Sequence, residues 1–594
     1  MQINKIEPPY WYIGLAKIIN NLHIMIYGED LNDVEVETDL AHIGNITTTQ
    51  DADSHYSIFH LNIDPNAVVV GEYEFRLSKQ KQYAHFNYKI LNEKENNIEK
   101  VTPKDVLYLI MPDRFSHAKS TNPVAKDVDR QNPNGWHGGN IQGVKNHLDY
   151  LCDLGVTALW LTPIAENKMA PVKEKRKKYE FYHGYAATDF YAVDPHFGSL
   201  SDYQELVSAA HKKGMKVVMD MVLNHCGISH PWVKHLPTKT WLNESNPDKA
   251  RRTNYRLTTI VDPYRSYADA NDTVKGWFSG NMPDINMEDK EVLNYFIQLS
   301  LWWIASTGID AIRVDTYPYV NLESMKRWQQ AIHQVYPKLS IIAEAWVDEP
   351  AFTAEVQKRN SDGDNALIVM DFAFQGHLQE FMLGRNREKS SYALYNHFVY
   401  DYLYKDATQT LAFLDNHDMQ RWAYLCKDIQ KTKQTIGILL TMPRIPQLLY
   451  GTELGFKGDG GTDDGNFRQD FPGGWDDDSC NKFLESGRTD EEQEIFHFTK
   501  TLLKWRKSSK AITKGTMKHF IPHNGIYAYF RTFKNEKIMV IVNCKNTKGI
   551  VDLKQFAEET NHCSKGSDVL TGQEYLIDTL LNINENGILI LNLS

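Results

Sequence analysis

Several charged and polar side chains stand at the ends of short apolar segments, where they could act together. They are Asp113, Arg114, Asp220, Asn224, His225, Arg313, Asp315, Glu344, Asp415, His417 and Asp418. Carboxyl groups held close together repel and desolvate one another, so one can stay protonated while another is ionised. Cleavage of a glycosidic bond requires such a pair, one carboxyl group as acid and the other as nucleophile or base.

Arg313 and Asp315 are two residues apart in a predicted strand, so both side chains point to the same face. The guanidinium can then hold the Asp315 carboxylate ionised, as a nucleophile requires. Glu344 has no cation at the same spacing and lies in the apolar run from Ala343 to Trp346. We expect this setting to raise the pKa of Glu344, which suits a general acid.

Taken singly, each of these residues has a structural explanation. Asp220 could close a barrel layer through an ion pair, and a lone His225 or His417 is more often a hydrogen-bonded buried histidine than a catalytic one. Their joint placement at strand ends favours a shared site. A metal-dependent hydrolase is a weaker alternative, because the two histidines are scattered and the HExxH pattern is absent.

The segments that carry these residues alternate between helix and strand from Asp105 onward. In the clearest unit, we expect Ser201 and Gln204 to form a capping box, Gly214 to end the helix and a buried strand to follow. Eight apolar strands are predicted, at 106–111, 157–161, 216–222, 311–315, 340–344, 366–371, 409–414 and 446–450. Eight parallel strands with intervening helices close into a (β/α)8 barrel, whose functional residues gather at the carboxyl ends of the strands.

Strand-like alternation flanks this α/β segment on both sides. We expect an N-terminal β-sandwich over residues 1–95, a catalytic barrel over 96–509 and a C-terminal β-sandwich over 510–594. The gap after the third barrel strand is too long for one helix, which predicts an inserted subdomain at about 226–289.

Bulk properties exclude several classes of protein. The 594 residues are 42% hydrophobic and 24% charged, as in a folded multidomain protein. The net charge of −11 opposes binding to nucleic acid. Neither a membrane-spanning run nor a signal peptide is recognised, so we expect no membrane insertion and the compartment stays open. The six cysteines are widely spaced and are expected to be free thiols.

Seven ordered segments resemble those of the α-amylase family, glycoside hydrolase family 13. They are GVTALWLTP (155–163), DMVLNH (220–225), MPDIN (282–286), GIDAIRVDT (308–316), EAW (344–346), FLDNHD (413–418) and IPQLLYGTE (445–453). The resemblance implies that Asp315 is the nucleophile, Glu344 the general acid/base and Asp418 a third carboxylate that binds sugar hydroxyls. The implied substrate contacts are Tyr185, His225, Arg313 and His417. We also expect substrate binding by His183 next to Tyr185, by Asp220 and Asn224 at a strand end, and by Arg468 in the acidic loop.

The N-terminal sandwich and the segment Phe471-Pro-Gly-Gly-Trp475 are similar to the neopullulanase and cyclomaltodextrinase branch, in particular to starch-utilisation enzymes of Bacteroidetes. This resemblance implies a periplasmic location, with the cytoplasm as the alternative, and a homodimer through the N-terminal domain. Thr316 resembles the residue at this position in members that cut α-1,4 bonds. We therefore expect retaining, endo-type hydrolysis of α-1,4-glucosidic bonds in maltooligosaccharides, cyclodextrins, pullulan and soluble starch, with cleavage of α-1,6 bonds as a secondary activity. Transglycosylation by the same residues and a non-catalytic carbohydrate-binding scaffold are the alternatives.

One departure from this branch concerns calcium. Its members often hold the ion with an Asn-Gly-Asp-x-x-Asn-Asp loop and a later Gly-Gly-Asp, whereas this chain has Lys119 and Pro123 in the loop and Asn140 in the later segment. Because calcium requires several oxygen ligands, mostly carboxylates, we expect that no metal or cofactor is required. The acidic loop at 458–470 is expected to be a solvated loop beside the sugar cleft.

Overall fold

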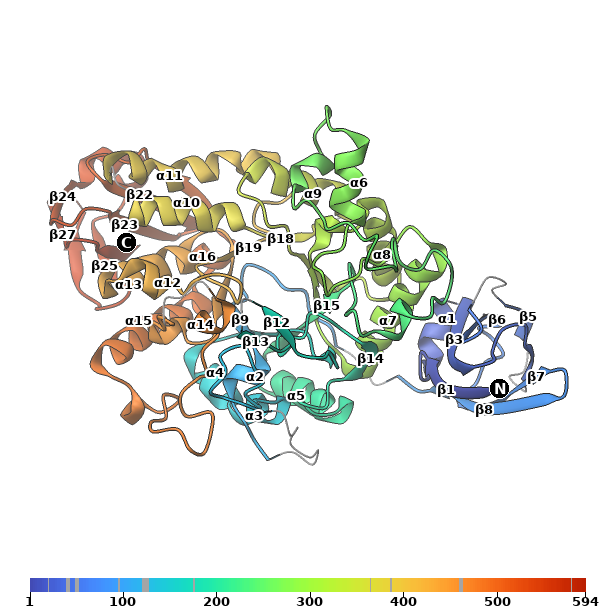
Figure 1. The fold of residues 1–594 in the computed structure, drawn as a ribbon. Coiled ribbons are helices and arrows are strands. Elements are labelled where there is room, and N and C mark those ends of the chain that lie inside the picture. The colour runs from blue at the N-terminus through green and yellow to red at the C-terminus, as the bar shows by residue number, and fades with distance from the viewer. Residues whose placement is uncertain are drawn as a thin grey trace.

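A closed barrel of eight parallel strands forms the centre of the molecule, between two β-rich domains (Figure 1). The computed structural model describes residues 1–19, 21–38, 43–48, 53–93, 97–119, 128–174, 177–363, 365–384, 387–458, 463–577 and 580–594. The barrel strands are β9 (Leu107–Ile110), β10 (Ala158–Leu161), β15 (Lys216–Val222), β16 (Ala311–Asp315), β17 (Ser340–Ala343), β18 (Ile368–Met370), β19 (Thr410–Phe413) and β20 (Ile445–Leu449). The predicted (β/α)8 barrel with flanking β domains is therefore confirmed.

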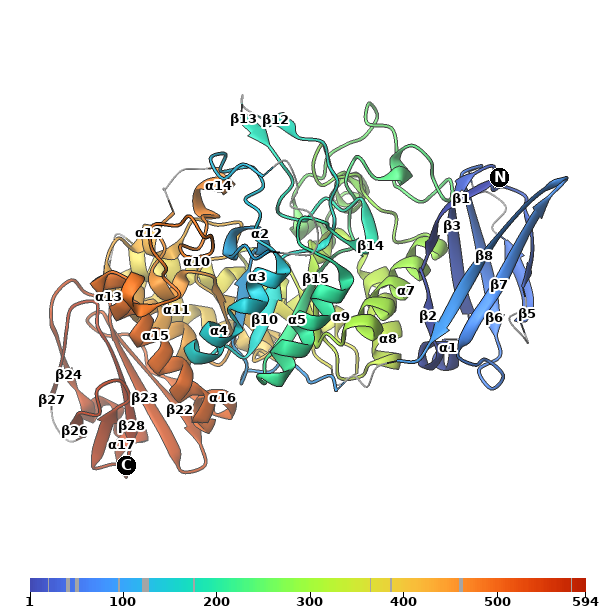
Figure 2. The ribbon, with the colours of Figure 1, turned by 90° about the horizontal axis from the view of Figure 1, so that it is seen from below.

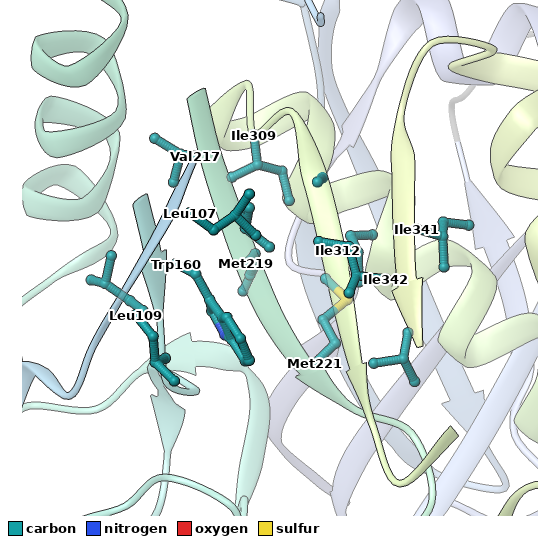
Figure 3. Packing of buried hydrophobic residues seen from close by; sticks show 14 of the residues in the cluster. Leu107, Leu109, Trp160, Val217, Met219, Met221, Ile309, Ile312, Ile341 and Ile342 are labelled. Atoms are coloured by element: carbon teal, nitrogen blue, oxygen red, sulfur yellow. The ribbon is translucent and has the colours of Figure 1, made fainter. Parts of the chain in front are cut away.

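Helices lie between successive barrel strands and after the last one. Their bounds are α2 (Pro112–Phe115), α3 (Ile141–Asn146), α4 (Leu148–Leu154), α5 (Leu200–Lys212), α7 (Lys290–Thr307), η3 (Tyr317–Tyr319), α8 (Leu322–Val335), α9 (Pro350–Asn360), α10 (Phe372–Leu383), α11 (Arg387–Val399), η4 (Tyr400–Leu403), α12 (Trp422–Cys426), α13 (Ile429–Thr441), η5 (Thr452–Leu454), α14 (Asp464–Phe467), η6 (Glu485–Gly487), α15 (Asp490–Ser508) and α16 (Lys510–Lys514). Apolar side chains such as Leu107, Val217 and Ile312 are fully buried among the strands (Figure 3). This packing holds the strand ends in fixed positions.

Two helices show how the local sequence sets the helix bounds. The capping box of α5 is formed by Ser199 and Asp202, so the predicted pair Ser201 and Gln204 was wrong by two residues. Ser199 caps the helix because its side chain accepts a hydrogen bond from the N–H of Asp202, while the Asp202 carboxylate accepts one from the N–H of Ser199. Helix α7 ends at Gly308, whose φ of 77° is readily adopted by glycine, and the chain then enters β16.

Two long segments interrupt the alternation of strand and helix. The first, after β10, contains β11 (Ala165–Glu166), β12 (Val172–Glu174), β13 (Lys177–Tyr179) and β14 (Asp189–Val193). The second, after β15, contains η1 (Pro231–Val233), η2 (Leu257–Ile260) and α6 (Tyr267–Lys275), and it is the insertion expected after the third strand. Figure 2 shows β12 and β13 rising from one end of the barrel. Both insertions follow carboxyl ends of strands, so they border the functional end of the barrel.

The two outer domains are built from antiparallel sheets. The N-terminal domain has sheets β1-β3-β6-β5 and β2-β8-β7-β4, and the C-terminal domain has sheets β21-β22-β23-β28-β25-β26 and β24-β27. Their bounds are β1 (Gln2–Glu7), β2 (Trp11–Tyr12), α1 (Ile13–Ile18), β3 (Asn21–Glu29), β4 (Glu35–Thr38), β5 (Ile43–Thr48), β6 (Tyr56–Ile63), β7 (Gly71–Lys79), β8 (Gln82–Leu91), β21 (Thr516–His519), β22 (Ile526–Phe533), β23 (Glu536–Asn543), β24 (Gly549–Asp552), η7 (Leu553–Phe556), α17 (Ala557–Thr560), β25 (Lys565–Asp568), β26 (Glu574–Leu576), β27 (Leu580–Ile583) and β28 (Ile588–Leu593). Within the described ranges, every helix is too short or too polar to traverse a bilayer.

The N-terminal domain packs against α7 of the barrel (Figures 1 and 2). The buried Gln298 side chain accepts a hydrogen bond from the His23 N–H and donates one to the His23 carbonyl, each at 2.8 Å. Tyr12 donates to the Ser306 hydroxyl at 3.0 Å. A barrel helix therefore satisfies backbone groups of a strand in another domain.

We predict that Gln298→Ala weakens this contact between the two domains. The substitution leaves the His23 N–H and carbonyl without their partners, which costs about 1–3 kcal/mol of unfolding free energy. Urea denaturation would measure the loss. The matched control is Gln334→Ala, at an exposed position of helix α8. Equal stability of the two variants would contradict the assignment.

Candidate active site

Three adjacent barrel strands bring three carboxyl groups to the same end of the barrel. Asp220 lies in β15, Asp315 is the last residue of β16, and Glu344 follows β17 directly. The parallel register pairs Asp220 with Arg313 and places β17 on the other side of β16. Side chains from neighbouring strands can therefore meet across β16.

The Arg313 guanidinium contacts all three carboxyl groups. Its Nη1 lies 2.8 Å from Asp220 Oδ1 and 2.9 Å from Asp315 Oδ1, and its Nη2 lies 2.9 Å from Glu344 Oε2. Glu344 has no cation at the matching spacing in its own segment, as expected, but it does contact Arg313 of the neighbouring strand. Spacing within one strand does not reveal a cation on the neighbouring strand, and that neighbour supplies the contact.

Asp315 and Glu344 differ in pKa, although both are buried. Burial raises the pKa of Asp315 to about 6, against the lowering effect of Arg313. Burial also raises the pKa of Glu344 to about 8, with further raising by Asp315 and Asp418. The predicted rise at Glu344 agrees with this value. At Asp315, however, burial outweighs the arginine that was expected to dominate its pKa. Between these values, Asp315 is ionised and Glu344 is protonated.

The chain between these two carboxyl groups has an unusual conformation at Thr316. This residue has φ 47°, in the left-handed region that threonine rarely adopts. Its N–H donates to Glu344 Oε2 at 2.8 Å, and the N–H of Tyr317 donates to the Glu344 carbonyl at 3.1 Å. The strained turn after Asp315 thus fixes the position of Glu344.

Asp220 lies beneath the reacting groups and holds two other side chains. Its Oδ2 accepts from the Tyr185 hydroxyl at 2.9 Å and from the Trp160 indole at 3.0 Å. The Tyr185 ring in turn stacks on His417, with centroids 5.3 Å apart and planes 5° from parallel. Sequence reasoning identified Tyr185 and His417 but missed Trp160, which lies inside a buried strand with no polar pattern around it.

Three histidines near the carboxyl groups are buried and neutral. His183 Nδ1 accepts from the Tyr185 N–H at 3.0 Å. His225 Nε2 donates to the Tyr185 carbonyl at 3.0 Å, while its Nδ1 accepts from the Asn224 amide at 3.3 Å. Burial lowers the pKa of His225 to about 4 and also lowers the pKa of His183 and of His417. Each ring can therefore donate or accept without adding charge.

A second arginine organises the opposite wall of the site. Arg468 Nη2 lies 2.9 Å from Asp418 Oδ1 and 3.0 Å from Asp464 Oδ2, and Arg468 Nε donates to the His417 carbonyl at 2.6 Å. His417 Nε2 lies 3.2 Å from Asp418 Oδ2. Asp418 is thus held from two sides.

These groups face a cavity of about 540 Å³. Its lining is mostly aromatic and carboxylic: Tyr179, His183, Tyr185, His225, Tyr255, Phe278, Met282, Asp315, Thr316, Tyr319, Glu344, Trp346, Asp418, Asp464 and Arg468. Among the described residues, Asp220, Asn224, Arg313 and His417 stand behind this lining. Sequence reasoning missed Tyr179, Tyr255, Phe278 and Tyr319 as lining residues. Those residues lie in the insertions and the turn after β16, where no periodic pattern indicates a burial direction.

In the segment 117–140, where we expected no calcium to bind, the side chains of His117 and Asn140 form hydrogen bonds with the protein backbone. The Asn140 side chain accepts from the Gly143 N–H at 2.8 Å and donates to the Ala118 carbonyl at 2.7 Å. His117 Nδ1 lies 2.7 Å from the Gly138 carbonyl, and Lys119 is exposed. Pro123 of the same loop, and Asp459 of the acidic loop, lie outside the described residues. In the described part of this loop, the Asn140 side chain is therefore already used in hydrogen bonds within the protein.

Three protein-family models match the chain. "Alpha amylase, catalytic domain" matches residues 109–528, "Cyclomaltodextrinase, N-terminal" matches 5–94 and "Cyclo-malto-dextrinase C-terminal domain" matches 517–592. The first model alone covers more than half of the chain, in the region that holds the cavity.

Individual relatives agree with these models. A cyclomaltodextrinase of Thermoanaerobacter pseudethanolicus is 25% identical over 80% of this chain and 76% of its own length. A cyclomaltodextrin glucanotransferase of Niallia circulans is 29% identical over 74% of this chain and 59% of its own length. The solved structure of an Anoxybacillus α-amylase has a TM-score of 0.68 at 26% identity and covers 84% of this chain and 99% of that one. The chain belongs to the α-amylase family of glycoside hydrolases, with N- and C-terminal domains of the cyclomaltodextrinase type.

Proposed function

We propose that this protein hydrolyses α-1,4-glucosidic bonds in maltooligosaccharides, cyclodextrins and related α-glucans, with retention of configuration. The observation that carries the proposal is the pair Asp315 and Glu344, held by one guanidinium at a cavity and separated in pKa. A retaining glycosidase needs an ionised nucleophile and a protonated acid on opposite sides of one bond.

In the first step, Glu344 donates its proton to the glycosidic oxygen while an Asp315 oxygen attacks the anomeric carbon. The bond to the leaving sugar breaks and a covalent glycosyl-enzyme forms. Both contacts of Glu344 reach Oε2, so we place the transferable proton on Oε1. In the second step, the ionised Glu344 takes a proton from water, and the water oxygen displaces Asp315 from the same carbon.

The remaining residues are assigned by where they lie. Five residues that line the cavity are proposed to contact the sugar: His183, Tyr185, His225, Arg468 and, as the third carboxylate, Asp418. Arg313, His417, Asp220 and Asn224 are proposed to act by positioning these groups. These last four residues were expected to bind substrate directly, so fewer residues are now proposed to contact the sugar.

Transfer to a sugar hydroxyl is the second candidate, since it differs only in the acceptor of the second step. It is favoured by the relatives that carry glucanotransferase names. A homodimer through the N-terminal domain and a periplasmic location also stay proposals. The scaffold alternative would be supported only by a complete absence of turnover.

The first test is product analysis with cyclodextrin, pullulan and soluble starch. We expect linear maltooligosaccharides that are initially released as α-anomers, and panose from pullulan. Asp315→Asn should lower kcat by about 10⁴-fold or more, and Glu344→Gln by about 10²–10⁴-fold. Asp248→Asn and Glu323→Gln, at exposed positions, are the matched controls. Initial release of β-anomers would refute retention, and an active Asp315→Asn variant would refute the assigned nucleophile.

The pH profile is the second test. The ionised Asp315 is lost as the pH falls through about 6, and the protonated Glu344 is lost as the pH rises through about 8. We therefore expect a bell-shaped plot of kcat/KM with its maximum between these values. The residual activity of Glu344→Gln should lose the alkaline limb and keep the acid limb. An unchanged alkaline limb in this variant would contradict the role of Glu344.

The third test concerns calcium. Because the Asn140 side chain in the described part of the 117–140 loop is already hydrogen-bonded, we expect calcium added back after dialysis against EDTA to change neither activity nor melting temperature. The measurement is paired assays and thermal scans before and after dialysis against chelator, with calcium added back. A calcium-dependent rise in melting temperature that disappears in Asn140→Ala would overturn the expectation.

A further inference from the structure

Two histidines and a glutamate from different domains meet at the contact between the N-terminal domain and the barrel. His23 is in β3 and His60 is in β6, while Glu291 is in the first turn of α7. His23 Nδ1 lies 3.0 Å and His60 Nε2 lies 3.2 Å from the same oxygen, Glu291 Oε2. The three ligand atoms lie within 4.8 Å of one another.

We propose that His23, His60 and Glu291 bind a divalent transition-metal ion of the zinc class. Two imidazole nitrogens and one carboxylate oxygen form a common three-residue ligand set for zinc, with water in the fourth position. Metal–ligand bonds of about 2.0–2.2 Å in a tetrahedral site place ligand atoms roughly 3.3 Å apart. The observed separations of 3.0 and 3.2 Å are close to this spacing.

The surroundings of the cluster also suit a metal site. The second ring nitrogen of His23, Nε2, accepts a hydrogen bond from the Asn21 side-chain nitrogen at 3.0 Å, and that of His60, Nδ1, lies 3.4 Å from the Thr47 hydroxyl. A histidine that binds metal through one nitrogen usually donates from the other. His60 can donate to Thr47, and His23 can donate to Asn21 once the amide turns to present its oxygen. The backbone of His23 is fixed by Gln298. The side chains keep 9%, 25% and 19% exposure at His23, His60 and Glu291, so an ion can enter from solvent.

Binding requires two rearrangements: the Asn21 amide turns, and one imidazole ring reorients. The two rings stack with centroids 4.2 Å apart, so their lone pairs do not yet point at a common position. His60 is the more exposed ring and turns to admit the ion. Each neutral ring then carries its proton on the nitrogen that faces the turned Asn21 amide oxygen or the Thr47 hydroxyl. Coordination involves no change of oxidation state, and it ties β3 and β6 to α7.

A second group, formed by Asp53, His55 and His235, lies at the same domain contact and needs to be distinguished. It suits a metal less well, because His235 Nδ1 lies 3.7 Å from Asp53 Oδ1 and the two imidazole rings are 3.6 Å apart. All three of its side chains are at least 30% exposed. It serves as an internal comparison for the test.

The test is zinc binding to the full-length chain without a histidine tag. Equilibrium dialysis with metal analysis, and cobalt(II) absorption as a probe of tetrahedral geometry, would be measured for the native chain and for His60→Gln and Glu291→Gln. We expect both variants to weaken zinc binding by more than about tenfold and to lose the cobalt band, and Asn21→Ala to weaken binding by about 10- to 100-fold. His85→Gln, an exposed histidine in the same domain, and His55→Gln should bind as the native chain does.

Zinc should also raise the melting temperature of the native chain and fail to raise that of Glu291→Gln. Zinc binding that survives in both ligand variants, or that is lost in His55→Gln instead, would overturn the assignment. A lower melting temperature in the variants without any zinc response of the native chain would identify the cluster as a hydrogen-bonded contact only.

Discussion

The buried guanidinium of Arg313 contacts carboxyl groups from three adjacent strands, and the geometry of the site depends on it. Desolvating an arginine and its partners costs several kcal/mol per ion, which is offset only when the contacts are short and well directed. The close contacts of Arg313 with Asp220 and Asp315 meet this condition. The barrel is what makes them possible, because its packed strands fix the side-chain positions before any substrate arrives.

One guanidinium cannot balance three ionised carboxylates in a buried place. Asp220 accepts two further hydrogen bonds, from Tyr185 and Trp160, and these favour its charged form. Glu344 accepts one backbone hydrogen bond, and the negative charges of Asp315 and Asp418 raise its pKa. The excess proton therefore resides most favourably on Glu344. Glu344 is therefore the acid of the site because the arginine contact and the hydrogen bonds stabilise the charged forms of the other carboxyl groups.

The sequence was sufficient to predict the barrel, since eight apolar segments and their intervening helices leave few other closed arrangements. It also placed Asp315 and Glu344 at the candidate site, because the ends of strands and the spacing of residues within a strand can be read directly from the sequence. It could not show that Arg313 reaches Glu344, since that contact crosses between strands. Nor could it place Tyr255 and Phe278, because the insertion that carries them has no period that separates an inner face from an outer one.

The histidines of the site add hydrogen-bonding groups without adding charge. Burial and nearby arginines oppose a positive charge on their rings. Burial and Arg468 lower the pKa of both His183 and His417, and burial lowers that of His225 to about 4. The rings therefore stay neutral across the range in which Asp315 and Glu344 differ in protonation. The two imidazoles that line the cavity, His183 and His225, can hydrogen-bond to a sugar, while the charge balance of the site is controlled by carboxyl groups and two arginines.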